Sequence, residues 1–132
     1  MLSRVEKFEV ALKQTECDAV LVTNLKNIYY LTGFSGTEAT VFISKSRRIF
    51  LTDSRYTLIA KGVVKGFDII ETRDALGEIA KIIGDDKLEK IGFDDQVSYA
   101  YFKMLKSVFA AYELIPMSSF IENLRMIKDE GE

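Results

Sequence analysis

The chain has 132 residues, of which 48% are hydrophobic and 29% are charged, so it is long enough for one domain with a hydrophobic core and lacks the composition of a disordered chain. Lys plus Arg number 18 and Asp plus Glu number 20, and the net charge of −2 is a poor match to a nucleic-acid-binding surface, which is normally basic. The absence of histidine and the presence of a single cysteine, Cys17, exclude Ser-His-Asp and Cys-His catalytic sites, an internal disulfide and a cysteine-based zinc cluster.

The N-terminal residues resemble neither an export signal nor a membrane anchor. Charges of both signs interrupt residues 1–8, and no apolar run approaches the ~20 residues that a membrane-spanning helix needs. A single cysteine without an export signal favours a reducing cytoplasm, and we expect no membrane partner. Cys17 lies between Glu16 and Asp18, whose charges raise the pKa of a thiol, so we expect a buried and unreactive side chain.

Hydrophobic periodicity predicts an alternation of helices and strands. The helices show apolar residues every three or four positions, whereas the strands are short apolar runs bounded by polar residues or glycine. This order predicts an α/β fold with a mixed, partly parallel central sheet of about six strands flanked by helices. In chain order, the predicted elements are helix 3–15, strand 19–22, helix 25–31, strands 39–44 and 48–52 as a hairpin, a helix after Asp53, strand 67–71, a helix after Asp74, strand 90–93, a helix after Ser98, strand 112–115, and a last helix after Ser119 that carries Ile121, Leu124 and Ile127.

Short polar side chains stand where the predicted helices begin, as expected of N-cap residues. Ser3 and Ser119 are each followed three residues later by a glutamate, which is the capping-box pattern. Gly33 predicts the end of the second helix, and Pro116 predicts the end of the sixth strand. The remaining predicted N-caps are Asn24, Asp53, Asp74 and Ser98.

Aspartates at the predicted strand ends leave a metal site open as an alternative. Ligands bind at the carboxyl ends of strands in open α/β sheets, and a two-metal site of the ribonuclease H-like type needs several carboxylates within a few ångströms. Helix capping and turn formation account for the same residues, and we favour those structural roles. The candidate ligands are Asp18, Asp53, Asp74, Asp94 and Asp95.

Three segments together resemble the creatinase/prolidase N-terminal domain. Residues 27–36 (NIYYLTGFSG) resemble the family's N-[IV]-x-Y-[LF]-[TS]-G-[FY]-x-[GS], residues 51–56 (LTDSRY) resemble L-T-D-x-R-Y, and residues 124–128 (LRMIK) resemble the L-R-x-[IV]-K that leads to the catalytic domain. The motifs follow the family's order, and the resemblance spans about residues 1–130. It implies that residues 1–132 form one domain with a ribonuclease H-like, creatinase N-terminal type of fold. Because the helical pattern still runs at residue 128, we expect a longer protein with a catalytic "pita-bread" domain downstream.

The resemblance implies a non-catalytic role within an enzyme. In the family, such a domain precedes the metallopeptidase domain of Xaa-Pro dipeptidases and aminopeptidases P, which holds two divalent metals, usually Mn, and cleaves the peptide bond before proline. We therefore expect a dimerisation and active-site-capping domain of a cytoplasmic, homodimeric dipeptidase, with no catalytic residue, metal ligand or cofactor of its own. Its expected partners are its own catalytic domain and a second subunit, without nucleic acid. The alternatives are a self-contained two-metal hydrolase and a stand-alone interaction domain.

By the same resemblance, the loop after the second helix is the candidate for contact with a partner subunit or a substrate. Phe34 and Glu38 are expected to face the neighbouring subunit or the distal end of a substrate. The second motif is expected to have structural roles, as a helix cap and a local salt bridge. The loop residues are Phe34, Ser35, Gly36, Thr37 and Glu38, and those of the second motif are Asp53, Arg55 and Tyr56.

Overall fold

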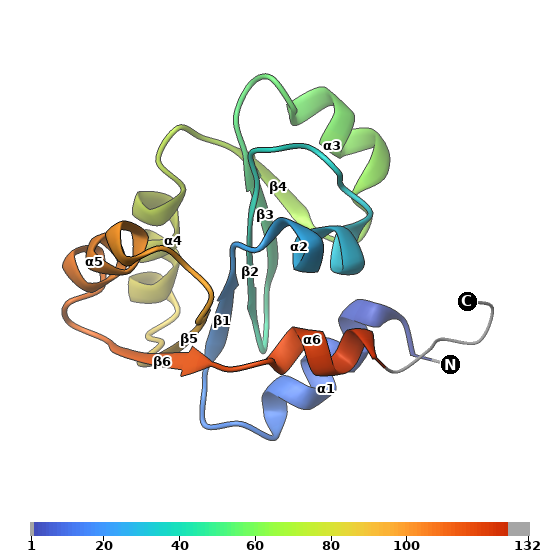
Figure 1. Ribbon diagram of the computed structural model, residues 1–132. Helices are drawn as coiled ribbons and strands as arrows, with labels where there is room; N and C mark the ends of the chain where they lie inside the picture. Colours follow the sequence, from blue (N-terminus) through green and yellow to red (C-terminus); the bar gives the residue numbers. More distant parts are fainter. Residues whose placement is uncertain (1, 127–132) are drawn as a thin grey trace.

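A computed structural model describes residues 2–126, in which helices and strands alternate along the chain (Figure 1). The predicted order of elements is confirmed, and most bounds differ by a residue or two, although the helix predicted after Asp53 begins only at Thr57. The prediction that the last helix carries Ile127 lies outside the described residues. No helix within these residues is long and apolar enough to cross a lipid bilayer. The elements are α1 (Arg4–Lys13), β1 (Ala19–Val22), α2 (Leu25–Thr32), β2 (Thr40–Ser44), β3 (Arg48–Thr52), α3 (Thr57–Val63), β4 (Asp68–Glu71), α4 (Ala75–Asp85), β5 (Lys90–Asp94), α5 (Tyr99–Val108), β6 (Glu113–Met117) and α6 (Phe120–Arg125).

The strands form one mixed, six-stranded sheet in the order β4-β3-β2-β1-β5-β6. Strand β2 runs antiparallel to its neighbours β1 and β3, whereas the pairs β1–β5, β3–β4 and β5–β6 are parallel. All strands except β2 therefore end at the same edge of the sheet, and β2 begins there. Because ligands bind at the carboxyl edge of open α/β sheets, a functional site is expected at this edge.

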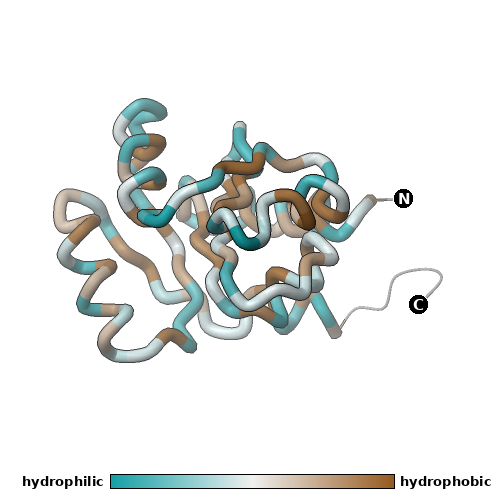
Figure 2. Tube along the Cα trace, turned by 90° about the horizontal axis from the view of Figure 1, so that it is seen from above, coloured by the Kyte–Doolittle hydropathy of each residue, from teal (hydrophilic) through white to brown (hydrophobic). Residues whose placement is uncertain are grey.

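Helices cover both faces of the sheet and divide the core into two layers (Figure 1). On one face, α1, α2, α3 and α6 pack over Val20 and Phe50, and on the other, α4 and α5 pack over Leu21 and Phe42. Figure 2 shows hydrophobic and hydrophilic residues alternating along the helices, as expected when one side of each helix is buried. The central strands are buried on both faces, which is why they are continuous apolar runs in the sequence.

Side-chain hydrogen bonds confirm several of the predicted helix starts. The capping box of α1 forms in both directions, since Glu6 N–H donates to the Ser3 hydroxyl and Ser3 N–H donates to the Glu6 carboxylate at 2.9 Å. The side chain of Asn24 accepts two backbone hydrogen bonds at the start of α2. Asp74 and Ser98 accept the corresponding bonds at the starts of α4 and α5.

Three predictions about element ends are wrong. Asp53 does not cap α3, which begins at Thr57 without a side-chain capping bond, because the Asp53 carboxylate binds Arg55. Ser119 does not complete a capping box, because its φ of 56° is left-handed and a capping side chain needs an extended backbone. Pro116 lies inside β6 rather than beyond its end.

Strand β6 tolerates Pro116 because it is an edge strand of the sheet. The N–H of Glu113 donates to the carbonyl of Glu89, and the alternation along a strand places the nitrogen of Pro116 on the outward side. No ladder hydrogen bond is lost there. The missing donor also makes this exposed edge less able to pair with another strand.

Candidate functional site

Residues 33–38, called the 33–38 loop below, belong to the connection between α2 and β2 and lie at the carboxyl edge of the sheet. The loop begins with a glycine whose φ of 80° turns the chain out of α2, a left-handed conformation that is free of steric cost without a Cβ. Ser35, Thr37 and Glu38 are exposed, whereas Phe34 is buried. The loop therefore presents three polar side chains at the edge where most strands of the sheet end.

The expectation that Phe34 faces a neighbouring subunit is wrong, because its ring is 2% exposed and lies in the core of this domain. The ring makes edge-to-face contacts with Phe50 of β3 and with Tyr56, at centroid distances of 5.0 and 5.5 Å. Its burial anchors the loop. Gly36 crosses this ring so closely that a Cβ would lie 2.4 Å from Cζ of Phe34 and 2.9 Å from Cε1 of Tyr56. Position 36 therefore requires glycine because the two rings leave no room for a Cβ, and not because of its backbone conformation.

Residues of the second motif, 51–56, hold the loop from the other side. The Tyr56 hydroxyl lies 2.8 Å from the Thr37 hydroxyl, and the buried Thr52 hydroxyl donates to the carbonyl of Glu38. The hydrogen bond with Thr37 lowers the pKa of the Tyr56 phenol. Together with the contact between the Phe34 and Tyr56 rings, these bonds make the second motif and the 33–38 loop one packed unit.

Asp53 and Arg55 form the expected local salt bridge. The Asp53 carboxylate accepts the backbone N–H of Arg55 at 3.0 Å and binds its guanidinium, with Nη2 at 2.7 Å. Hydrogen bonds from Arg55 hold the pKa of Asp53 below its ordinary value. The guanidinium also lies 5.3 Å from the centre of the Tyr56 ring. Because the Arg55 side chain is 65% exposed, the pair orders the turn and adds little to stability.

Three clefts adjoin the 33–38 loop. Glu38 lines two of them, one of about 370 Å³ that is also lined by Asp53, Arg55 and Arg73, and one of about 350 Å³ between the turns that follow β1 and β5. The third, of about 520 Å³, lies between the middle of the loop and α2. Ser35, Thr37 and Glu38 therefore each line a cleft, and the arrangement suits contact with another molecule.

The cleft between the loop and α2 combines cationic with apolar side chains. Arg4, Lys26 and Arg125 line it together with Leu25 and Tyr29, which are 42% and 56% exposed. Within residues 2–126, no acidic side chain lines this cleft, and Nε of Arg125 is buried without a hydrogen-bond partner. The cleft therefore favours a ligand or protein surface that carries carboxylates.

The first motif also holds α6, a relationship that was not predicted from the sequence. The amide nitrogen of Asn27 donates to the carboxylates of Asp94 at 3.2 Å and Glu122 at 2.7 Å, and the Tyr30 hydroxyl donates to the Leu124 carbonyl at 3.2 Å. Asn27 stands at helical spacing with the apolar residues that α2 buries. A side-chain amide on the buried side of a helix needs polar partners, and that was the signal in the sequence.

Two of the candidate metal ligands, Asp18 and Asp74, serve the fold. Asp18 accepts the backbone N–H groups of Glu89 and Lys90, which lowers its pKa, and Asp74 caps α4. Within residues 2–126, no group of three or more His, Cys, Asp and Glu side chains could hold a metal ion. The two divalent metals that the resemblance implies for the whole enzyme therefore do not fit this part of the chain. The same arrangement gives no support to a self-contained two-metal hydrolase.

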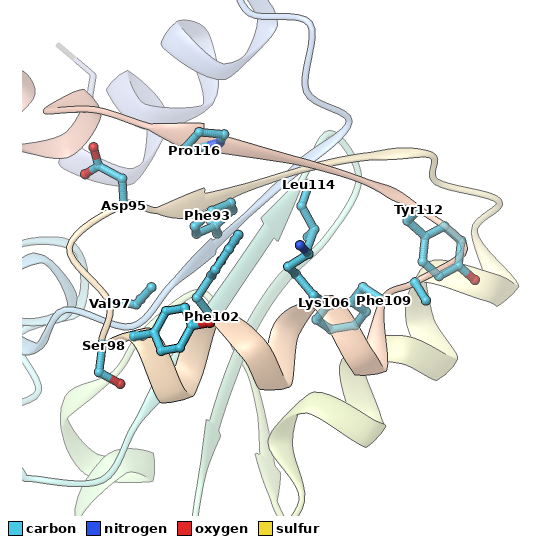
Figure 3. Close-up of a pocket in the computed structure, with 12 residues that line it drawn as sticks. Phe93, Asp95, Val97, Ser98, Phe102, Lys106, Phe109, Tyr112, Leu114 and Pro116 are labelled. Atoms are coloured by element: carbon cyan, nitrogen blue, oxygen red, sulfur yellow. The ribbon is translucent and has the colours of Figure 1, made fainter.

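A cavity of different character lies between α5 and the edge strand β6 (Figure 3). It encloses about 660 Å³, and its lining includes Phe93, Phe102 and Leu114, with Lys106 among them. The rings of Phe93 and Phe102 stack at 5.5 Å. None of the predicted loop or second-motif residues lines this cavity, so it is separate from the loop that the motifs build.

Residues 4–127 match the creatinase/prolidase N-terminal domain. This chain belongs to that family. The resemblance carried by the three motifs is confirmed.

Relatives of this creatinase/prolidase N-terminal domain are peptidases. The uncharacterized peptidase YqhT of Bacillus subtilis is 34% identical over 131 residues, which are 98% of this chain and 37% of that protein. Aminopeptidase P, an Xaa-Pro aminopeptidase from Streptococcus thermophilus, is 59% identical in sequence, and its crystal structure matches with a TM-score of 0.91. The match covers 93% of this chain and 96% of that chain. An Xaa-Pro dipeptidase from Bacillus anthracis is 32% identical with a TM-score of 0.88, over 98% of this chain and 37% of that chain. The fold class is confirmed, and the homologues are N-terminal domains of Xaa-Pro peptidases.

Proposed function

We propose that this chain is the non-catalytic N-terminal domain of an Xaa-Pro peptidase, in which it caps the active site and takes part in a homodimer. The observation that supports this most is the 33–38 loop, which the second motif holds in place while the polar side chains of the loop line clefts at the carboxyl edge. A braced loop holds its side chains in place, which reduces the entropy lost on contact with a substrate or a second subunit. Cleavage belongs to the part of the enzyme outside this domain, together with two divalent metals that we take to be manganese.

The proposed partners are the enzyme's own peptidase domain and a second subunit, in the cytoplasm. The cationic cleft between the loop and α2 suits an acidic surface on either partner. The net charge of −2 argues against nucleic acid, and no cofactor is assigned to this domain.

The proposed substrate is a peptide with proline in second position. Dipeptidase activity is the more specific prediction, based on the length of the domain and the short loop after Gly36. Solved relatives carry both names, aminopeptidase and dipeptidase, so both substrate lengths belong in the test.

A domain exchange tests the proposal. The Bacillus anthracis dipeptidase is prepared complete, without the segment that this chain matches, and with this chain in place of that segment. We expect the exchange to restore hydrolysis of an Xaa-Pro dipeptide that the deletion abolishes, with an Xaa-Pro-Yaa tripeptide as the second substrate. The 132-residue chain alone, supplied with Mn²⁺, should hydrolyse neither peptide. Turnover by the isolated chain in proportion to its concentration, or a folded exchange protein no more active than the deletion, would contradict the proposal.

A further inference from the structure

A buried polar cluster joins α2, β5 and α6. The amide nitrogen of Asn27 donates to Oδ2 of Asp94 at 3.2 Å and to Oε2 of Glu122 at 2.7 Å. Asn27 and Asp94 are 1% and 6% exposed, and Glu122 is half-buried. One neutral amide therefore stands between two carboxylates that different elements contribute.

The space around the cluster is too small for a compensating ion with its hydration shell. The three side chains line a cavity of about 10 Å³, whose other walls are apolar residues of β1, β6 and α6. A space of that size holds about one water molecule. Among residues 2–126, neither Asp94 nor Glu122 forms a salt bridge.

Glu122 is the charged group that acts on Asp94. Within the described part of the chain, the other groups that act on this carboxylate are neutral, namely the asparagine amide and the backbone N–H groups of Asn24 and Gln96. Tyr30, the titratable residue of α2 nearest to α6, directs its hydroxyl to a backbone carbonyl of α6 instead. Burial, reinforced by the charge of Glu122, raises the pKa of Asp94. A proton on the cluster removes the repulsion and supplies an additional hydrogen-bond donor.

Helix α6 has six residues, so its position depends on its contacts with the rest of the domain. Ile121 is buried, the rings of Phe120 and Phe8 meet at 5.2 Å, and the carbonyl of Leu124 accepts the hydroxyl of Tyr30. The Glu122 carboxylate adds a hydrogen bond from Asn27. Of these four contacts of α6, this is the one whose strength depends on the charge of a side chain.

We propose that Asp94, Asn27 and Glu122 form a proton-dependent clamp that holds α6 against α2 more firmly as the pH falls. When α6 detaches, Glu122 moves away and Asp94 is hydrated, so the pKa of Asp94 returns toward its ordinary value of about 4. The attached state thus binds more protons at pH values above about 4, and attachment weakens as the pH rises through the raised pKa. If the proposed function holds, α6 is the helix that leads toward the peptidase domain. The clamp then makes the position of this domain relative to the peptidase domain sensitive to pH.

Hydrogen exchange in the 132-residue chain tests the clamp. The amides of Asn123 and Met126 donate to the carbonyls of Ser119 and Glu122, and their protection reports whether α6 is attached. After correction for intrinsic exchange, protection at about pH 5 should exceed that at about pH 8 by about threefold or more.

Two variants separate the clamp from general effects of pH. Asp94→Asn keeps an acceptor for the Asn27 amide but carries no charge, so it should flatten the pH dependence and keep protection high at the alkaline end. Glu122→Gln removes the other charge and should reduce the pH dependence, while the burial of Asp94 preserves part of it. This second variant keeps the test open if Asp94→Asn fails to fold. Asp95→Asn, an exposed neighbour, is the matched control and should behave as the unchanged chain does.

Equal protection at both pH values in the unchanged chain would overturn the clamp, as would a pH dependence that is as large in the folded Asp94→Asn or Glu122→Gln variant as in the unchanged chain. The measurement needs no peptidase domain. Its failure would therefore leave the proposed function untouched, and a failed domain exchange would leave the clamp untouched.

Discussion

The hydroxyl groups of Tyr56 and Thr37 lie 2.8 Å apart and join the second sequence motif, across 19 positions of the chain, to the residue that follows the first motif. Beneath this contact, the Phe34 ring packs on Tyr56, and the Thr52 hydroxyl holds the carbonyl of Glu38. Side chains of β3 and of the turn after it therefore fix a loop that belongs to no sheet or helix. This packing explains why residues typical of the family occur both in the loop and at the end of a distant strand.

Tyr56→Phe removes the hydroxyl and keeps the ring against Phe34. We expect the free energy of unfolding to fall by about 0.5–1.5 kcal/mol, the net contribution of one hydrogen bond, with faster amide exchange at Thr37. Urea unfolding and hydrogen exchange measure the two effects. Tyr29→Phe is the control, because that ring is 56% exposed, and should change stability by less than about 0.5 kcal/mol. Unchanged exchange at Thr37 in Tyr56→Phe would show that the hydroxyl does not brace the loop.

Gly36→Ala should destabilise the domain by about 1–3 kcal/mol through overpacking. The new Cβ would lie 2.4 Å from Cζ of Phe34 and 2.9 Å from Cε1 of Tyr56, so two packed rings must move. Gly62→Ala is the matched control. It lies within α3, where a Cβ would point into open space, and should stabilise the helix by up to about 1 kcal/mol. Thermal unfolding of the two variants should therefore shift in opposite directions, and shifts of the same sign would contradict the packing argument.

The local parts of the fold could be predicted because they depend on neighbours in the sequence. The Ser3–Glu6 capping box and the Asn24 cap each involve residues within three positions. Cys17 also agrees with its prediction, since it is 1% exposed and burial raises the pKa of its thiol. Continuous apolar runs indicated buried strands, and Leu21 is indeed 1% exposed.

The candidate site was harder to predict because it depends on contacts between distant segments. In the sequence, an aromatic residue beside glycines can belong either to the surface or to the core. Phe34 belongs to the core because its ring packs against Phe50, which is distant in the sequence. The carboxylate of Asp53 suits either a cap or an ion pair, and the guanidinium two residues later decides in favour of the pair. The local pattern shows that Asn27 needs a polar partner, but its bond to Asp94 spans 67 positions, so the pattern could not show which residue that partner is.

Leu21→Ala should lower the free energy of unfolding by about 2–5 kcal/mol, because it leaves a cavity between the sheet and α4 and α5. Leu58→Ala makes the same chemical change on α3, where the side chain is 83% exposed, and should stay within about 0.5 kcal/mol. Urea unfolding of both variants measures the difference. A small effect at Leu21 would mean that β1 is not buried as the structure places it.

Asp18 should make stability depend on pH with the sign opposite to that of Asp94. Backbone hydrogen bonds from Lys90 and Glu89 lower the pKa of Asp18 in the folded state, so its contribution is present above the unfolded pKa of about 4 and is lost as the pH falls through the lowered value. In urea unfolding, the unchanged chain should have a higher free energy of unfolding than Asp18→Asn at about pH 6, and this difference should shrink as the pH falls to about 2. Asp85→Asn, at an exposed position, should show no such convergence. A constant difference between the unchanged chain and Asp18→Asn across this range would refute the linkage.

Glu38→Ala in the exchanged dipeptidase should alter substrate binding rather than metal content. The side chain is exposed and lines two clefts, while Thr52 holds the backbone at the same position, so truncation leaves the loop in place. Loss of one polar contact should raise KM by up to about tenfold, with kcat changed by less than about twofold. Glu113→Ala, an exposed glutamate of β6, is the control and should change neither constant. Steady-state kinetics and metal analysis decide between the roles, because loss of bound metal from the Glu38 variant would mean that this residue supports coordination instead of substrate binding.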